Sequence, residues 1–142
     1  MSIVSAIYTE IIGDSVFTNQ LGSYDFGAGD APAVFTAEPA PEDSDSPMVV
    51  ITQIGGSLGT ARDRTHRGGE VTIDVKLWGD KGDSEKVLRE LADDLWLLLD
   101  RADLTITGME FCYCLAEPPR RLSDPQGFPG FLVSCRVLVR VT

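Results

Sequence analysis

Two segments of the chain carry apolar residues at the spacing of an amphipathic helix. Near the amino terminus, a short helix is predicted over Ile3–Ile12, with Ser2 as its N-cap. A longer helix is predicted over residues 84–100, capped by Asp83 or Ser84. Its apolar side, which we expect to cover a sheet, comprises Val87, Leu88, Leu91, Leu95, Leu98 and Leu99.

Alternating apolar and polar residues predict strands between and after these helices, because successive side chains of a strand point to opposite faces. The segments are 34–36, 48–54, 70–78, 104–116 and 131–141. In 70–78 one face is apolar and the other is predicted to be wet: Val71, Ile73, Val75 and Leu77 against Glu70, Thr72, Asp74 and Lys76. In the last strand, the residues predicted to face the core are Phe131, Val133, Cys135, Val137, Val139 and Val141.

Glycine- and proline-rich stretches separate these elements. Residues 13–33 are predicted to form a loop, and residues 55–69 and 117–130 to form two further long loops. The order of helices and strands predicts a single domain over residues 1–142, of the α+β class. We expect a mostly antiparallel sheet of four to five strands with two helices packed on one face.

Charge is unevenly distributed along the chain, whose net charge is −10. The first 61 residues hold eight acids and no Lys or Arg, whereas the remainder holds the other 14 acids and all 12 bases. A negative balance argues against binding nucleic acid through its phosphates, which requires clustered Lys and Arg. We expect a surface that is acidic on one side and mixed on another. Copies of a homo-oligomer can use that asymmetry to pair unlike edges; a merely solvated surface is the alternative.

The sequence also contains features that indicate in which cellular compartment the protein is made and whether it associates with a membrane. No stretch reaches the roughly 18 consecutive apolar residues that a membrane span requires. The first residues lack the basic and apolar regions of a signal peptide. Cys112 and Cys114 alternate along one apolar segment, which predicts that both lie on one strand face as small buried thiols. We therefore expect no membrane association and a chain made in a reducing cytoplasm.

The sequence offers few groups for catalysis. The one histidine, His66, is predicted to lie in a loop, and although Gly55-Gly56-Ser57-Leu58-Gly59 fits the Gly-x-Ser-x-Gly pattern, no helix pattern follows it as a nucleophile elbow requires. One histidine and a same-face cysteine pair do not make a zinc site, and Asp43 and Asp45 lack the glycine and final glutamate of a calcium loop. The glycine-rich segment 55–60 follows a strand but lacks the lysine of a phosphate-binding loop. We therefore predict that the chain is not an enzyme and holds no metal or cofactor.

Arginines are concentrated in the loops 55–69 and 117–130. Together these loops carry five of the 12 basic residues. In an acidic protein they suit contact with an acidic surface, such as the 38–45 stretch of a neighbouring copy. The candidate interface residues are therefore Arg62, Arg64, Arg67, Arg120, Arg121, Glu42, Asp43 and Asp45. Two mobile, solvated loops are the alternative.

Several features occur in a recognisable order along nearly the whole chain. The first helix is followed by the short strand at 34–36, an acidic stretch between Pro41 and Pro47, and the strand that begins at Met48. Next comes an aspartate within an apolar strand that ends in tryptophan, Ile73-Asp74-Val75-Lys76-Leu77-Trp78, and then a helix and two closing strands. In this order the chain resembles the tail-completion, or tail-terminator, family of siphophage-type tails, related in fold to the lambda tail terminator. The glycine-rich stretch 22–30 is longer than that family's pattern.

The resemblance implies a structural virion protein. Members of that family form hexameric rings that cap the completed tail tube, end its polymerisation and present a surface to the head–neck connector, or stopper, protein. For this chain the resemblance implies a homo-hexamer that assembles in the host cytoplasm. It would lie at the head-proximal end of the tail and let the genome DNA pass without specific binding. The alternatives are a head-completion or stopper protein of the connector and, from a different class, a small-ligand binding module.

Overall fold

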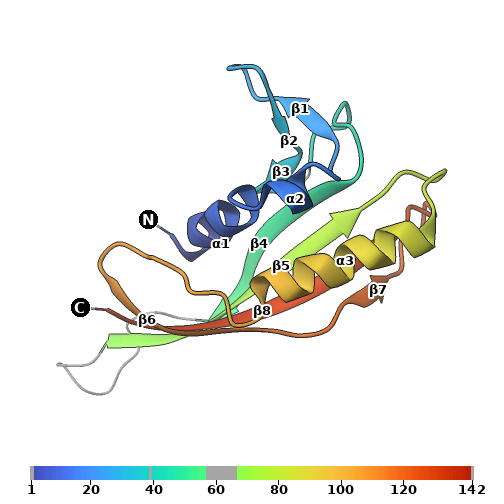
Figure 1. Cartoon of the computed structure of the whole chain (residues 1–142). Coiled ribbons are helices and arrows are strands. Elements are labelled where there is room, and N and C mark those ends of the chain that lie inside the picture. The colour runs from blue at the N-terminus through green and yellow to red at the C-terminus, as the bar shows by residue number, and fades with distance from the viewer. Residues whose placement is uncertain (1, 39, 57–66, 142) are drawn as a thin grey trace.

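The computed structural model describes residues 2–38, 40–56 and 67–141. Figure 1 shows the helices on one side of the main sheet, with α3 lying along the strands and the β1–β2 hairpin projecting beyond the sheet. In chain order the elements are α1 (Ile3–Ile12), α2 (Ser15–Thr18), β1 (Ser23–Asp25), β2 (Asp30–Pro32), β3 (Val34–Phe35), β4 (Met48–Gly56), β5 (Arg67–Trp78), α3 (Glu85–Leu99), β6 (Met109–Ala116), β7 (Arg120–Leu122) and β8 (Gly130–Val141).

The strands form one main sheet and one separate hairpin, β1–β2. The main sheet has the order β3-β4-β5-β8-β6, and β7 pairs with β8 on the same side as β6. The β3–β4 pair is parallel, whereas β4–β5, β5–β8, β6–β8 and β7–β8 are antiparallel. The α+β class with a mostly antiparallel sheet is therefore confirmed, with six strands in place of four or five.

The local sequence explains where α1 and α3 begin. The Ser5 amide donates a hydrogen bond to the Ser2 hydroxyl at 3.0 Å, and the Val87 amide donates to the Ser84 hydroxyl at 3.5 Å. These caps satisfy amides that the first helical turn leaves unpaired, so both predicted helices are confirmed. Of the helices in the described ranges, none is both long and apolar enough to cross a bilayer.

The main core lies between the helices and one face of the sheet. The predicted core residues of β5 are fully buried: Val71, Ile73, Val75 and Leu77. Those of β8 are also buried where their side chains are described: Phe131, Val133, Cys135, Val137 and Val139. From α3, a stripe at i, i+3, i+7 and i+11 packs against them: Leu88, Leu91, Leu95 and Leu99.

Two residues of the predicted apolar side of α3 are less buried than expected. Val87 is 62% exposed, and Leu98 is only partly buried at the margin of the core. Successive helical residues are turned by about 100° from one another, so a neighbour of the buried stripe can face solvent. The buried stripe of α3 is thus narrower than the apolar pattern suggested.

A small cluster lies on the opposite face of the sheet, near β3. Its buried residues are Ala33, Phe35 and Val50, and Tyr24, Ala40, Met48 and Trp78 pack against them. β4 therefore contributes side chains to both faces of the sheet. Val50 belongs to this cluster, whereas the residues on either side of it, Val49 and Ile51, belong to the main core. Gly130 lets the Trp78 ring approach β8: a Cβ at Gly130 would overlap two ring carbons and lie 3.1 Å from a third, Cδ2.

Several predicted loops and boundaries were wrong. Residues 13–33 contain α2 and the β1–β2 hairpin, residues 117–130 contain β7, and strand pairing in the 104–116 segment begins only at Met109. The helix α2 is a single turn, capped by Asp14, whose Oδ1 accepts a hydrogen bond from the Phe17 amide at 3.1 Å. Elements this short span too few residues to generate a periodic pattern, so composition alone suggested loops.

A β-bulge in β6 overturns the prediction for Cys112. Phe111 pairs with Val139 and Tyr113 pairs with Leu138, which leaves Cys112 as the extra residue. Cys114 is buried as predicted, whereas Cys112 is exposed. Because a bulge shifts the alternation by one residue, two thiols at a spacing of two do not share a buried face.

Candidate interaction surfaces

The acidic stretch between β3 and β4 is anchored at one end. The Asp45 amide donates to the Ser23 carbonyl at 3.3 Å, and the Ser23 hydroxyl donates to Asp45 Oδ2 at 3.4 Å. Gly22 permits this approach, because a Cβ there would overlap the Asp45 backbone. Glu42 and Asp43 are exposed and make no ion pair within the described part of the chain. Of the three predicted acids, Asp45 thus holds the loop, and the other two are available to a partner.

Of the predicted arginines, the structure describes the side chains of Arg120 and Arg121. Arg62, Arg64 and the side chain of Arg67 lie outside what the structure describes. Arg121 pairs with Glu85 at the start of α3, with its Nε 3.0 Å from Oε1. Its neighbour Arg120 is exposed and points to the opposite face of β7. Arg121 is therefore matched by its own chain, and Arg120 is the better candidate for an external acidic partner.

The face of the main sheet turned away from the helices is here called the open face. At Asp74 this face is less exposed to solvent than predicted. Asp74 is 9% exposed and accepts a hydrogen bond from the Ser134 hydroxyl at 3.0 Å. Beside it, Lys76 Nζ lies 3.0 Å from Glu38 Oε1 in the segment that follows β3. The prediction of a wet face was wrong at Asp74, because β4 and β8 flank this residue and Ser134 replaces water as its partner.

Further along the open face, β6 makes one side-chain contact across β8 to β5 and another with β8 itself. The Tyr113 hydroxyl donates to Glu70 Oε2 at 2.6 Å, and the Arg140 guanidinium binds Glu110. The hydrogen bond to Glu70 raises the pKa of Tyr113, and the bond to Glu110 raises the pKa of Arg140. Each contact favours the protonated form of the tyrosine or the arginine.

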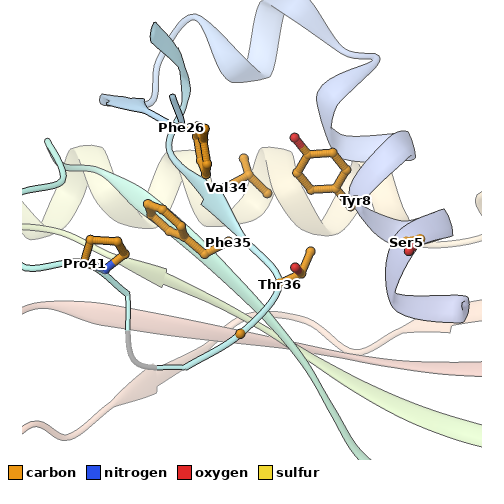
Figure 2. A pocket seen from close by; sticks show the side chains of 8 residues that line it. Ser5, Tyr8, Phe26, Val34, Phe35, Thr36 and Pro41 are labelled. Carbon is orange, nitrogen blue, oxygen red and sulfur yellow. The ribbon is translucent and has the colours of Figure 1, made fainter. Parts of the chain in front are cut away.

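A shallow hollow opens between α1 and the β1–β2 hairpin. Its volume is about 520 Å³, and Figure 2 shows Tyr8, Phe26 and Phe35 around it. Phe26 is 48% exposed, and its ring centre lies 5.5 Å from that of Phe35. The described residues that line the hollow are apolar or neutral. Such a lining suits an apolar group of a partner better than a charged small molecule.

The solvent side of the helix layer carries exposed apolar residues beside carboxylates. Val16 on α2 is 76% exposed and Leu97 on α3 is 67% exposed. With Asp14 and Asp94 they line one hollow of about 480 Å³. The apolar pattern does not predict this surface, because Val16 falls in a segment that is predicted to be a loop. One signal was present: residues 95–99 are all apolar, and five consecutive helical residues cannot all face the sheet.

The described residues contain no group of three or more His, Cys, Asp or Glu that could hold a metal ion. The three cysteines are free thiols. Hydrogen bonding to Cys114, followed by burial, raises the pKa of Cys135. This thiol therefore stays protonated at neutral pH, where it is a poor nucleophile. His66 lies outside the described residues.

The likeness of this chain to known proteins is a likeness of fold. No family model and no curated protein matches the chain. The fold recurs in a virion. The chain is similar to one in the solved structure of a "virion of native gene transfer agent (GTA) particle", with a TM-score of 0.69 and 16% sequence identity. The match covers 98% of this chain and 95% of that chain. At this identity the likeness establishes a shared fold, and the narrower tail-terminator resemblance stays a prediction.

Proposed function

We propose that this protein is a structural component of a phage-like virion. The observation that carries the proposal is the likeness to a chain of a gene transfer agent virion, because it spans 98% of this chain and 95% of that one. A likeness over such lengths concerns the whole architecture rather than one common motif. The surfaces described above also suit contacts with other proteins, since exposed apolar residues lie beside unpaired charges.

Within the virion, we propose the role that the sequence resemblance implies. Copies of the chain form a ring, a hexamer, at the head-proximal end of the tail. One rim of the ring caps the tail tube and ends its polymerisation, and the other rim receives the head–neck connector. In this role the ring acts through the shape and charge of its surfaces, without catalysis or a cofactor. Its assembly takes place in the host cytoplasm.

Two charge properties support a ring of this kind. A closed ring needs unlike surfaces on each subunit, and the first 61 residues carry acids without Lys or Arg, whereas the remainder carries both signs of charge. The net charge of −10 would also repel the DNA backbone, so a genome could pass the ring without adhering to it. In this proposal, Glu42 and Asp43 face a neighbour or the tube, together with Arg62, Arg64, Arg67 and Arg120.

The deciding experiment is electron microscopy of particles assembled without this protein. We expect tails of uncontrolled length that fail to join heads, and recovery when the wild-type chain is supplied in trans. Tails of normal length beside heads that leak DNA would instead assign the chain to the connector. Normal, infectious particles would overturn the proposal.

A second experiment tests the arginine-bearing loop within the same proposal. Arg64→Glu combined with Arg67→Glu should impair ring or tube assembly while the fold is retained. Lys86→Glu is the matched control, because Lys86 is an exposed base on α3 whose charge changes in the same direction. Unchanged assembly of the double variant would remove this loop from the interface.

A further inference from the structure

Two complementary surfaces lie on opposite sides of the sheet layer. The helix patch consists of Val16 and Leu97 together with the carboxylates of Asp14, Glu90 and Asp94. The sheet patch lies on the open face and consists of Leu115, Arg120, Arg136 and Leu138. One patch combines apolar side chains with acids, and the other combines leucines with arginines, with the Glu70 carboxylate bonded to Tyr113 at its margin beside Leu138.

Two features of the helix patch are unfavourable in an isolated chain: like charges one helical turn apart, and apolar surface exposed to water. Glu90 and Asp94 are both exposed and stand at i and i+4 on α3, where like charges destabilise a helix. Within the described residues neither takes part in an ion pair. Leu97 lies one turn from Asp93 and is 67% exposed, so apolar surface is left in water beside this charge. Apolar surface edged by carboxylates is suited to a partner that is apolar and basic.

The sheet patch has the opposite character. Arg136 pairs in register with Leu115, and Arg120 pairs in register with Leu132, so each guanidinium stands beside a leucine. Both arginines are exposed, and neither forms an ion pair in the described part of the chain. The other bases of this face, Lys76 and Arg140, are already matched by carboxylates. Arg120 and Arg136 therefore remain for an external acidic group.

Both edges of the sheet carry features that hinder the joining of copies by strand pairing, and the β6 edge is also covered by its own chain. At the β6 edge, the Arg101 amide donates to the Cys114 carbonyl at 2.8 Å, and the Ala116 amide donates to Asp100 Oδ1 at 3.0 Å. The bulge at Cys112 interrupts the strand before this point. On the opposite side, β3 covers β4 only at Val49 and Val50, so β4 itself forms the edge from Ile51 onward, and a bulge at Ile54 interrupts this stretch. Short, bulged and covered edges are the means by which proteins avoid edge-to-edge association.

We propose that the helix patch of one copy docks on the sheet patch of the next. The carboxylates of Asp94 and Glu90 would meet the guanidinium groups of Arg136 and Arg120, and Val16 and Leu97 would pack on Leu115 and Leu138. Arginine binds carboxylates in a bidentate geometry, which fixes orientation as well as charge. The contact is heterologous, so each copy uses both patches and a closed ring leaves neither exposed. The inference rests on the proposed ring and supplies its subunit contact.

The test uses two charge-reversed chains that should fail alone and assemble together. Asp94→Arg places arginines on both patches, and Arg136→Glu places carboxylates on both patches. We expect each variant alone to associate at least 10-fold more weakly than the wild-type chain by sedimentation velocity. In an equimolar mixture, each altered patch meets its complement on the other variant. Native mass spectrometry should then show oligomers in which the two chains are equally represented.

Matched controls change the same charges elsewhere. Asp103→Arg and Lys81→Glu alter exposed residues outside both patches and should leave association unchanged. Circular dichroism of each variant monitors folding, and recovery on mixing itself requires that both chains are folded. Because the contact is partly electrostatic, raising the salt concentration should weaken the wild-type association.

The possible failures point to different conclusions. A wild-type oligomer that tolerates both reversals would reject this contact and leave the ring proposal standing. Folded variants that fail alone and do not recover when mixed would also reject the pairing of these patches. A wild-type chain that remains monomeric, both alone and with tail tubes, would count against the ring itself.

Discussion

The packing of Trp78 over Gly130 gives a stability prediction whose sign depends on a second residue. Replacing Gly130 with alanine puts a methyl group where the Trp78 ring lies, because the added Cβ would overlap two ring carbons. Trp78 is held by the small cluster around Phe35 and Val50, so its ring cannot move away without loosening those contacts. The substitution should therefore destabilise the protein.

Two opposing contributions set the magnitude. An extra methyl group forced into packed surroundings costs about 1–3 kcal/mol. Replacing a strand glycine with alanine recovers about 0.5–1 kcal/mol, because the unfolded backbone loses freedom. The net loss in the wild-type background should be about 0–2.5 kcal/mol. On a Trp78→Leu background only the backbone contribution remains, so the same substitution should stabilise by about 0.5–1 kcal/mol.

Equilibrium urea unfolding followed by far-ultraviolet circular dichroism measures the four free energies of this cycle. All samples need the same protein concentration, because association alters apparent stability. Gly55→Ala is the matched control: Gly55 also lies in a strand, and a Cβ there meets nothing within 4 Å. An equal cost of Gly130→Ala in both backgrounds would refute the proposed overlap with the Trp78 ring.

The remaining predictions concern burial. Leu95→Ala should lower the free energy of unfolding by about 2–5 kcal/mol, since Leu95 is fully buried, whereas Leu97→Ala should change it by less than about 0.5 kcal/mol; urea unfolding compares the two. Equal losses would contradict the orientation of α3. In the native protein, a thiol reagent should modify Cys112 rapidly and reach Cys114 and Cys135 only after denaturation, because those two are buried. Protection of all three thiols would argue against the bulge in β6.

The sequence was most informative where elements are long and have one buried face. The alternation in β5 and β8 predicted their core residues, and both long helices were placed to within a residue or two, with Ser2 and Ser84 as caps. In these segments the pattern records the burial of the apolar residues directly, and Asp74 in β5 is a polar position that does not face water.

The sequence was least informative where a structure depends on pairing between distant residues. The bulge at Cys112 exists only relative to β8, and the burial of Asp74 depends on Ser134, 60 residues away. The same reason explains the candidate interface. Nothing local to Arg121 indicates that Glu85 neutralises it, whereas Arg120, next to it in sequence, stays exposed.

The division of buried residues between two faces of the sheet affects how the molecule can fluctuate. The β1–β2 hairpin is fastened mainly through the small cluster at Ala33, Phe35 and Val50, while α3 and the long strands share the much larger core. Regions with few buried contacts open at a lower free energy than the whole protein unfolds. Through Ser23, that hairpin is tied to Asp45. The hollow beside Phe26 and the acidic stretch between β3 and β4 should therefore open and close together. A partner bound there would reduce the motion of both without changing the main sheet or its helices.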